Sequence, residues 1–245
     1  MICLGLDCAG RTAGVALMRE NTLLYECTLN LGLTHSQTAL CLVDGALRAA
    51  GLCAADVGLW AVCAGPGSFT GLRIGLAAVK GLAFAGDTPC APVSTLEALA
   101  ACHTGEATVV SALDARRGEV YWAAFSLPGP QRLTPDKAGK ADELADFLKT
   151  CKKPVFFVGD GAELCYNKFG RLEGVVPCPP ALGQSRAAGL CLAGLRMQQN
   201  GLAVPPAALL PQYLRLSQAE RERAARAQAA QGTGVPQTEL KQGPA

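Results

Sequence analysis

The sequence predicts an α/β protein in which one arrangement of strands and helices is used twice. The first observation is a group of three short apolar runs, at residues 2–6, 14–18 and 23–29, which predict antiparallel strands. The second is that an apolar run at 108–113, a polar turn and a strand-like run at 119–127 repeat the opening hairpin at a lag of about a hundred residues. The third is that helical and strand-like runs alternate between these two starts, which is typical of an α/β fold.

Composition places this protein among ordinary globular chains. Its 245 residues suffice for one large domain or two small ones, and its net charge of +2 is too small to predict a nucleic-acid or membrane surface. The 12 cysteines include no C-x-x-C pair, and most lie in apolar segments as small hydrophobic residues. Asp7 interrupts the first apolar run, and no run approaches the roughly 18 residues of a membrane span. We therefore expect a reduced, cytosolic protein with no signal peptide and no membrane contact.

Residues 34–50 are expected to form the first helix. A capping-box pair begins it and a glycine ends it, at Thr34, Gln37 and Gly51. Leu40, Val43 and Leu47 form one apolar stripe, and neighbouring apolar residues widen it over most of the circumference. Such a helix needs cover on more than one side.

A strand at 57–64, a tight glycine loop and a helix at 69–86 are expected next. Gly65 and Gly67 allow a sharp turn with open backbone N–H groups, and Ser68 or Thr70 can cap the helix. Open backbone amides at the start of a helix can bind an anion, so the first interpretation of this loop is a phosphate site.

The other interpretation of this loop is close packing. Gly71 and Gly75 are one helical turn apart, and they allow another backbone to approach the helix. We favour packing, because strand-loop-helix turns with glycine usually hold no ligand. The sheet can cover only one face of the helix, so the small-residue face is left for a second helix or a second protein. That face consists of Gly71, Gly75, Ala78 and Leu82.

The remaining elements follow from local signals. A strand is expected at 89–93, and Ser94 can cap a helix that runs to about residue 102. Prolines and mixed charges predict a loop at 128–140. After residue 217 the chain becomes rich in Ala, Arg, Glu and Gln, which predicts a tail that is partly helical or disordered. A helix, a strand and two further helices are expected between these, at 141–150, 155–158, 161–169 and 185–199.

No catalytic constellation stands out. The glycine turn is similar to a dinucleotide-binding turn, but that fold begins with its turn and ends its next strand in an acidic residue, where this chain has Ser94. No Walker sequence is present, because Lys80 lies in mid-helix. The two histidines, His35 and His103, have no partner at a spacing that predicts a base or a metal site. Asp7 is either a turn-shaping acceptor or a carboxylate that faces a metal–nucleotide, and its position favours the first.

Three motifs carry a resemblance to the bacterial TsaB family. They are the run at residues 65–75, the run Asp-Ala-Arg-Arg-Gly-Glu-Val-Tyr at 114–121 and the run Pro-Gln-Tyr-Leu-Arg at 211–215. The resemblance implies two actin-like, ribonuclease H-like lobes, the duplicated ASKHA ATPase-like architecture. On this basis we expect an N-terminal lobe at 1–105, a C-terminal lobe at 106–216 and a tail at 217–245.

The resemblance also implies that this chain is not an enzyme. TsaD, the catalytic relative, holds a metal with two histidines four residues apart, and Thr95 and Leu99 occupy those positions here. A glycine-paired phosphate turn of TsaD corresponds to residues 111–115, Ser-Ala-Leu-Asp-Ala, whose side chains close the backbone approach. We expect no metal and no cofactor on this chain. A vestigial nucleotide site would consist of Asp7, Gly65, Gly67 and Ser68.

The partners expected from the resemblance are TsaD, TsaE and, through the complex, tRNA. The chain would be a scaffold that pairs with TsaD for threonylcarbamoylation of adenosine 37 in tRNAs reading ANN codons, or a homodimer when alone. The predicted partner interface is Leu40, Val43, Leu47, Gly71, Gly75, Ala78 and Leu82. Two alternatives stay open, an ATP-binding ATPase or kinase of the same fold and a metallopeptidase-like protein.

Overall fold

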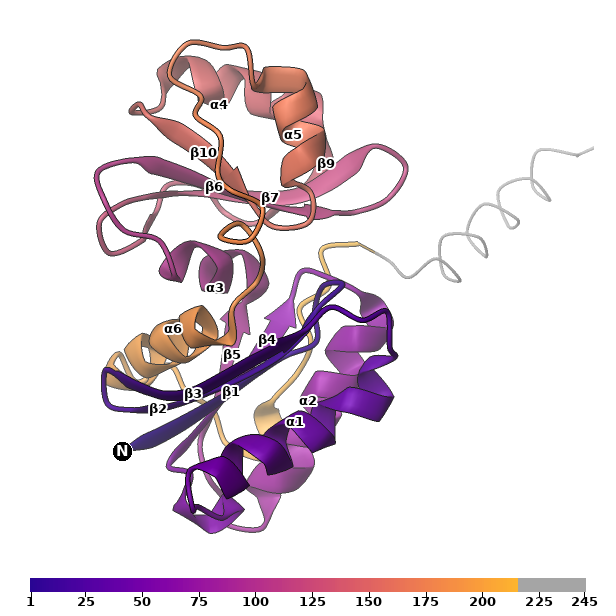
Figure 1. Ribbon diagram of the computed structural model, residues 1–245, viewed down its shortest axis with the longest axis vertical. Coiled ribbons are helices and arrows are strands. Elements are labelled where there is room, and N and C mark those ends of the chain that lie inside the picture. The colour runs from indigo at the N-terminus through magenta and orange to yellow at the C-terminus, as the bar shows by residue number, and fades with distance from the viewer. Residues whose placement is uncertain (216–245) are drawn as a thin grey trace, which may run out of the picture. The chain divides into compact units, whose positions relative to one another are not determined.

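A computed structural model describes residues 1–215, and the predicted tail at 217–245 lies outside the described residues. The first sheet contains β1 (Ile2–Asp7), β2 (Ala13–Arg19), β3 (Thr22–Leu29), β4 (Leu59–Gly65) and β5 (Cys90–Ser94). Their order in the sheet is β3-β2-β1-β4-β5 (Figure 1). β1, β2 and β3 pair antiparallel, whereas β1, β4 and β5 pair parallel. The predicted opening strands are therefore confirmed.

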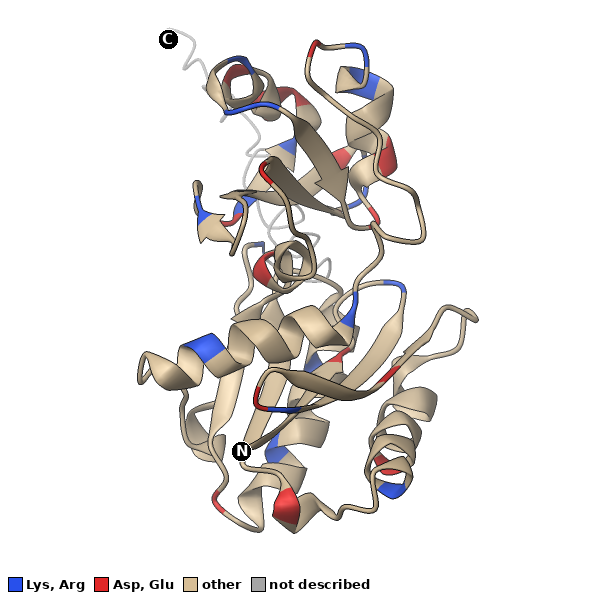
Figure 2. Cartoon of the chain, turned by 60° about the vertical axis from the view of Figure 1, so that its left-hand side comes forward, with Lys and Arg blue, Asp and Glu red and all other residues tan. Residues whose placement is uncertain are grey.

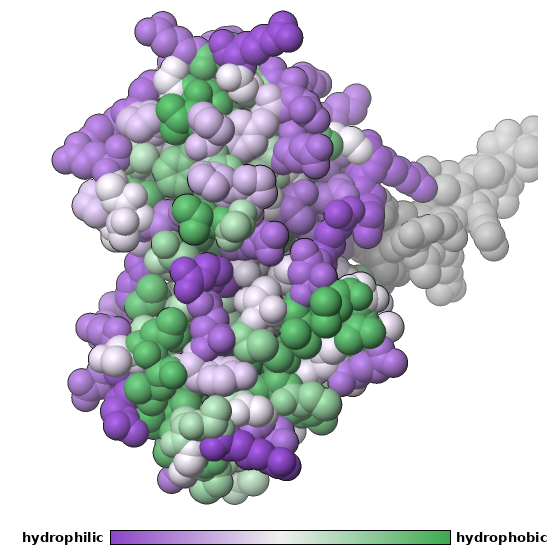
Figure 3. Space-filling model, viewed as in Figure 1, coloured by the Kyte–Doolittle hydropathy of each residue, from purple (hydrophilic) through white to green (hydrophobic). Residues whose placement is uncertain are grey.

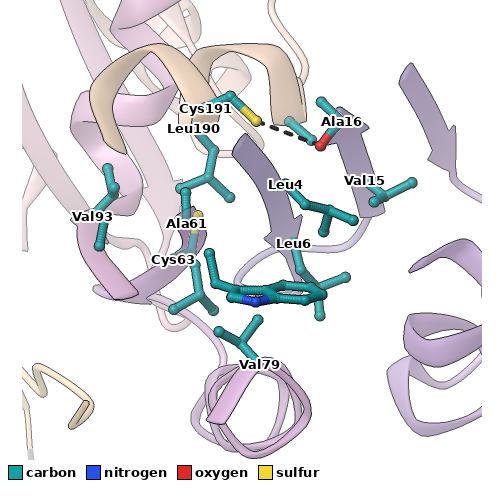
Figure 4. Packing of buried hydrophobic residues seen from close by; sticks show 14 of the residues in the cluster. Leu4, Leu6, Val15, Ala16, Ala61, Cys63, Val79, Val93, Leu190 and Cys191 are labelled. Carbon is teal, nitrogen blue, oxygen red and sulfur yellow. Dashed lines mark hydrogen bonds between the residues drawn. The ribbon is translucent and has the colours of Figure 1, made fainter. Parts of the chain in front are cut away.

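Helices cover both faces of this sheet. α1 (His35–Ala49) and α2 (Phe69–Phe84) lie on one face, and α6 (Ala187–Gln199) lies on the other (Figure 1). Figure 4 shows Val79 of α2 on one side of the strands and Leu190 and Cys191 of α6 on the opposite side. Because both faces are covered, β4 is buried along its whole length, as its unbroken apolar sequence requires.

The second sheet contains β6 (Thr108–Asp114), β7 (Glu119–Ser126), β8 (Gln131–Arg132) and β10 (Val155–Val158) in the order β10-β6-β7-β8, and β9 (Lys137–Lys140) also pairs with β7. α4 (Leu144–Thr150) and α5 (Ala162–Phe169) accompany it. Its core holds Trp122, Phe157 and Leu144. Three short 3-10 helices complete the description, at Ala54–Asp56, Ala141–Glu143 and Pro206–Ala208.

The two sheets repeat one pairing pattern. β1 pairs antiparallel with β2 and parallel with β4, and β6 pairs antiparallel with β7 and parallel with β10. The duplication suggested by the repeated hairpin is therefore visible in the topology.

The prediction of a loop over residues 128–140 is wrong in part, because this segment contains β8 and β9. Both strands pair with β7, on the edge that its pairing with β6 leaves open. The glycine, lysine and proline content of this segment gives no strand signal, since pairing with β7 rather than side-chain composition holds it.

The end of the chain differs from the predicted lobe boundary. Residues 106–216 were assigned to the second lobe, yet α6 and Leu209 belong to the core of the first sheet. Gly194 lies directly on that sheet, because a Cβ there would be 2.7 Å from the Cβ of Ala61. α3 (Thr95–Ala101) contributes to both halves, with Ala98 in the core of the first sheet and Leu96 and Leu99 in a cluster beside the second.

Candidate functional site

The glycine loop between β4 and α2 closes on its own chain. Gln212 donates its backbone N–H to Ala64 O at 2.7 Å, and a Cβ on Gly65 would lie 2.2 Å from Gln212 O. Gly65 also has φ of 133°, a conformation that favours glycine. A Cβ on Gly71 would lie 2.0 Å from Cys8 O. The glycines are therefore needed for close approach within the molecule.

Two backbone amides of the glycine loop and of the first turn of α2 donate within the chain. Ser68 N donates to Ala9 O at 2.7 Å, and Gly71 N donates to Ser68 Oγ at 3.3 Å. Ser68, rather than Thr70, is thus the N-cap of α2. A Cβ on Gly67 would lie 2.5 Å from Ala9 O, so the β1–β2 turn fills the space in front of the loop. The close approach that the packing interpretation expects is therefore present, and it is made by the chain's own β1–β2 turn.

Asp7 is 2% exposed at the end of β1. One carboxylate oxygen accepts the Ala9 N–H at 2.8 Å, and the other accepts the Ser185 hydroxyl. Both oxygens therefore shape the turn and hold the segment that leads into α6. Burial and the charge of Asp7 raise the pKa of the Cys8 thiol to about 12, so that this cysteine stays protonated.

Both histidines make contacts within the fold of the chain. His35 Nε2 lies 3.0 Å from Gly10 O, which ties the start of α1 to the β1–β2 turn. His103 packs edge-on against Phe156, and burial together with the Arg186 charge lowers its pKa. Thr95 and Leu99 are buried. Within residues 1–215, no three His, Cys, Asp or Glu side chains form a group able to hold a metal.

The predicted partner interface requires correction. Val43 and Leu47 are buried in the core of the first sheet, and Gly71 and Gly75 face the β1 end of that sheet. A Cβ on Gly75 would be 3.4 Å from the Cβ of Cys8. These four positions are unavailable to a partner because the chain's own sheet takes the small-residue side of the helices. Leu40 is 56% exposed, and Ala78 and Leu82 are half-buried.

An outward side of the two helices was missed by the sequence interpretation. Small residues spaced by four, Ala77, Gly81 and Ala85, are exposed on α2 and at its end, with Phe84 58% exposed beside them. We call six of the exposed residues of α1, α2 and the C-cap of α2 the outer face; its members are Leu40, Cys41, Ala77, Gly81, Phe84 and Ala85. The signal was present, since these positions lie opposite Leu72, Leu76 and Val79 on the helical wheel. In the view of Figure 3, apolar residues gather mainly around the first sheet and its helices.

A cavity of about 420 Å³ lies between the β1–β2 turn and the second sheet. None of the four residues of the predicted vestigial nucleotide site lines it. Its walls include Leu99 and Leu113. Burial raises the pKa of Asp160, another wall residue, and the charges of Arg11 and Arg116 oppose the rise.

Charge is distributed without a dominant sign. Figure 2 shows Lys and Arg interspersed with Asp and Glu, in agreement with the net charge of +2. No helix in residues 1–215 combines the length and apolarity that a membrane crossing requires.

Comparisons with known proteins agree with this architecture. A family model described as "TsaD: tRNA N6-adenosine threonylcarbamoyltransferase" matches residues 32–222. The tRNA threonylcarbamoyladenosine biosynthesis protein TsaB of Bacillus subtilis (strain 168) is 32% identical over 223 residues, which is 90% of this chain and 96% of that protein.

Solved structures give the same result for the fold. A Pseudomonas aeruginosa protein described as similar to peptidase YEAZ superposes with a TM-score of 0.74 at 30% identity, over 87% of this chain and 99% of that chain. A dehydratase activator from Clostridium difficile with bound ADPNP has a TM-score of 0.51 at 10% identity, over 82% of this chain and 97% of that chain. The second likeness concerns the fold alone. The predicted actin-like, two-sheet architecture is confirmed.

Proposed function

The chain belongs to the TsaB family, and we propose that it is a non-catalytic subunit that binds and activates TsaD in the synthesis of threonylcarbamoyladenosine in tRNA. The family model and the Bacillus subtilis relative support a place in this pathway. In this proposal TsaE joins the pair, tRNA is engaged through the complex, and the protein works in the cytoplasm.

The observation that carries the scaffold role is the outer face of α1 and α2. Leu40 and Phe84 are large apolar side chains with more than half of their surface exposed, on helices whose opposite sides are buried. α2 also presents the exposed small residues Ala77 and Gly81, which allow the backbone of another helix to approach closely. A pair of helices on a partner fits this surface.

The absence of catalysis in this chain is supported by its buried side chains. Thr95 and Leu99 supply no metal ligand of the kind the relative uses, and Asp7 is engaged by Ala9 and Ser185. The packing of Ala9 against the glycine loop counts against an ATPase or kinase of the same fold that would hold a phosphate there.

Interface variants test the proposal. Gly81→Gln adds a polar side chain to the outer face, and no atom outside its own helix turn lies within 4 Å of the Cβ position. Leu40→Glu places a charge there. Each variant is expected to remain folded, to lose co-elution with TsaD on gel filtration, and to reduce threonylcarbamoyladenosine in tRNA when it replaces the wild-type chain.

The matched control is Leu133→Glu, which places the same charge at a residue 47% exposed beside the second sheet. It is expected to leave TsaD binding unchanged. Full co-elution of both interface variants with TsaD would refute the interface. Normal levels of the modified nucleoside after depletion of this chain would refute the pathway.

A further inference from the structure

Within residues 1–215 the two sheets have four edges, and three of these edges are covered or short. β5, the last strand of the first sheet, exchanges two backbone hydrogen bonds of 2.8 Å with Val204, through Cys90. β10 of the second sheet is bridged by the segment around Val175, which bonds to both backbone groups of Val155 at 2.8 Å. The strands at the opposite edge, β8 and β9, have two and four residues. The fold therefore leaves little of these edges open to another chain.

β3 forms the fourth edge, and it is long and bare. It has eight residues, and within residues 1–215 no backbone hydrogen bond joins it to any element other than β2. A β-bulge at Leu24 disturbs the start of the strand, but Tyr25–Leu29 keeps a regular register with Ala13–Leu17. Because an edge strand turns half of its N–H and C=O groups outward, this stretch presents a ladder of unpaired donors and acceptors. An extended strand is the structure that can satisfy them.

The side chains of β3 lack the features that usually keep an open edge from pairing. The strand contains no lysine, arginine or proline, the residues with which natural proteins often block an edge. Leu23 and Leu24 are 41% and 40% exposed, although both are large apolar residues. Tyr25, Cys27 and Leu29 are half-buried. A second strand beside β3 would therefore cover apolar surface as well as pair the backbone.

The one charged residue of β3 is neutralised within its own chain. Glu26 accepts from Arg186 Nε at 3.1 Å and from the Ala188 N–H at 3.0 Å, and its side chain is 14% exposed. Its carboxylate thus lies against the start of α6 and is paired there. A strand that adds to this edge meets no unpaired charge, even when it carries the same glutamate.

These features fit a second copy of β3 better than a foreign peptide. In an antiparallel pair about a two-fold axis the strand meets its own sequence in reverse, so Leu23–Tyr25 of one copy lie opposite Cys27–Leu29 of the other when the pair is centred. Such a contact joins aliphatic, aromatic and threonine side chains and leaves neither edge open. A peptide would need pockets for its alternate side chains, and no residue of β3 lines the cavity of about 420 Å³.

From this arrangement we propose that two copies of the chain associate through β3, by antiparallel pairing that joins their two five-stranded sheets into one. This surface differs from the outer face, because no outer-face residue belongs to β3. Each copy therefore keeps its outer face for TsaD. The inference goes beyond the proposed role as a TsaD-binding subunit, and because it is tested on the chain alone, the two can fail separately.

Sedimentation velocity of the full chain over a range of concentrations, under reducing conditions, tests the proposal. A reversible equilibrium between monomer and dimer is expected. Leu23→Lys puts on the open edge the residue that natural edges use against pairing, and it is expected to raise the dissociation constant at least tenfold. The control Leu172→Lys places the same charge at a residue 45% exposed outside β3, and it is expected to leave the equilibrium unchanged. Circular dichroism shows beforehand that both variants are folded.

Amide exchange locates the contact. As the concentration of the chain is raised through the dissociation constant, exchange at residues 22–29 is expected to slow, because outward N–H groups of β3 become hydrogen-bonded. Exchange along α1 and α2 is expected to stay the same. Slowing along the two helices without slowing in β3 would overturn the assignment.

Leu40→Glu separates this contact from a homodimer through the helices. It changes the outer face and leaves β3 untouched, so the dimer is expected to persist in it. A dimer that is lost in Leu40→Glu and kept in Leu23→Lys would assign self-association to the helices and overturn the proposal. So would a chain that stays monomeric at every concentration, or one that grows beyond a dimer, since a two-fold pair of edges closes on itself.

Discussion

Gly71 and Gly81 are both glycines of α2, yet their surroundings are opposite. Gly71 lies against the carbonyl of Cys8, whereas no atom outside its own helix turn lies within 4 Å of the Cβ position at Gly81. The sequence shows both as small residues on a helix, and it correctly predicts that some backbone approaches closely. It cannot tell whether that backbone is the protein's own turn or a partner's helix, because a missing side chain carries no information on its neighbour.

The two glycines give a matched prediction at this scale. Gly71→Ala is expected to destabilise the fold by about 2 kcal/mol or more, because the methyl group would overlap Cys8 O and the turn would have to move. Gly81→Ala is expected to stabilise it by about 0.5–1 kcal/mol, since alanine is the better helix former. Urea unfolding of both variants measures the difference. Equal stabilities would contradict the close approach at Gly71.

At the scale of elements, the segment that follows α6 is fastened along α2. Lys80 Nζ donates to Ala207 O at 3.0 Å, and the ring of Phe69 stacks on Tyr213 at 4.5 Å. The guanidinium of Arg73 lies 3.9 Å from the centroid of the Phe69 ring and donates to the Tyr213 hydroxyl. Tyr213, one residue of the motif at 211–215, is thus explained by its contacts with α2.

Tyr213→Ala tests this attachment. Loss of the ring stack and of the Arg73 contact is expected to lower stability by about 1–2 kcal/mol and to speed amide exchange at Gln212. Leu210→Ala is the control, because Leu210 is 65% exposed in the same segment. Hydrogen exchange measured by mass spectrometry gives the exchange rate of this segment in both variants. Unchanged exchange at Gln212 in Tyr213→Ala would show that the aromatic stack does not hold the segment.

At the scale of the whole molecule, the return of α6 to the first sheet is the feature that sequence interpretation could not supply. Repeated hairpins and caps are local, and the strands at 108–113 and 119–127 were found by their own composition. The helix at 185–199 was also found, but its apolar residues do not say which sheet they cover. In the structure Glu26 of β3 holds the start of α6 at the first sheet, since it accepts from Arg186 Nε at 3.1 Å and from the Ala188 N–H at 3.0 Å.

Glu26→Ala is therefore expected to destabilise the protein by about 1–2 kcal/mol, because it removes a partly buried carboxylate from a helix N-terminus and from Arg186. Glu106→Ala removes an exposed partner of Lys152 and is expected to cost at most about 0.5 kcal/mol. Thermal unfolding at equal salt compares the two. If the Glu26 variant were as stable as the Glu106 variant, packing alone would hold α6 on the first sheet.

The position of α6 also has a consequence for the order in which the protein is made. The ribosome releases β1 and β4 long before residues 187–199. The apolar face of the first sheet that α6 covers therefore stays uncovered until α6 has been synthesised. That face closes only after the whole second sheet has emerged. The half that is translated first is thus the half whose core is completed last, and a fragment that ends at residue 105 would not contain the helix that covers it.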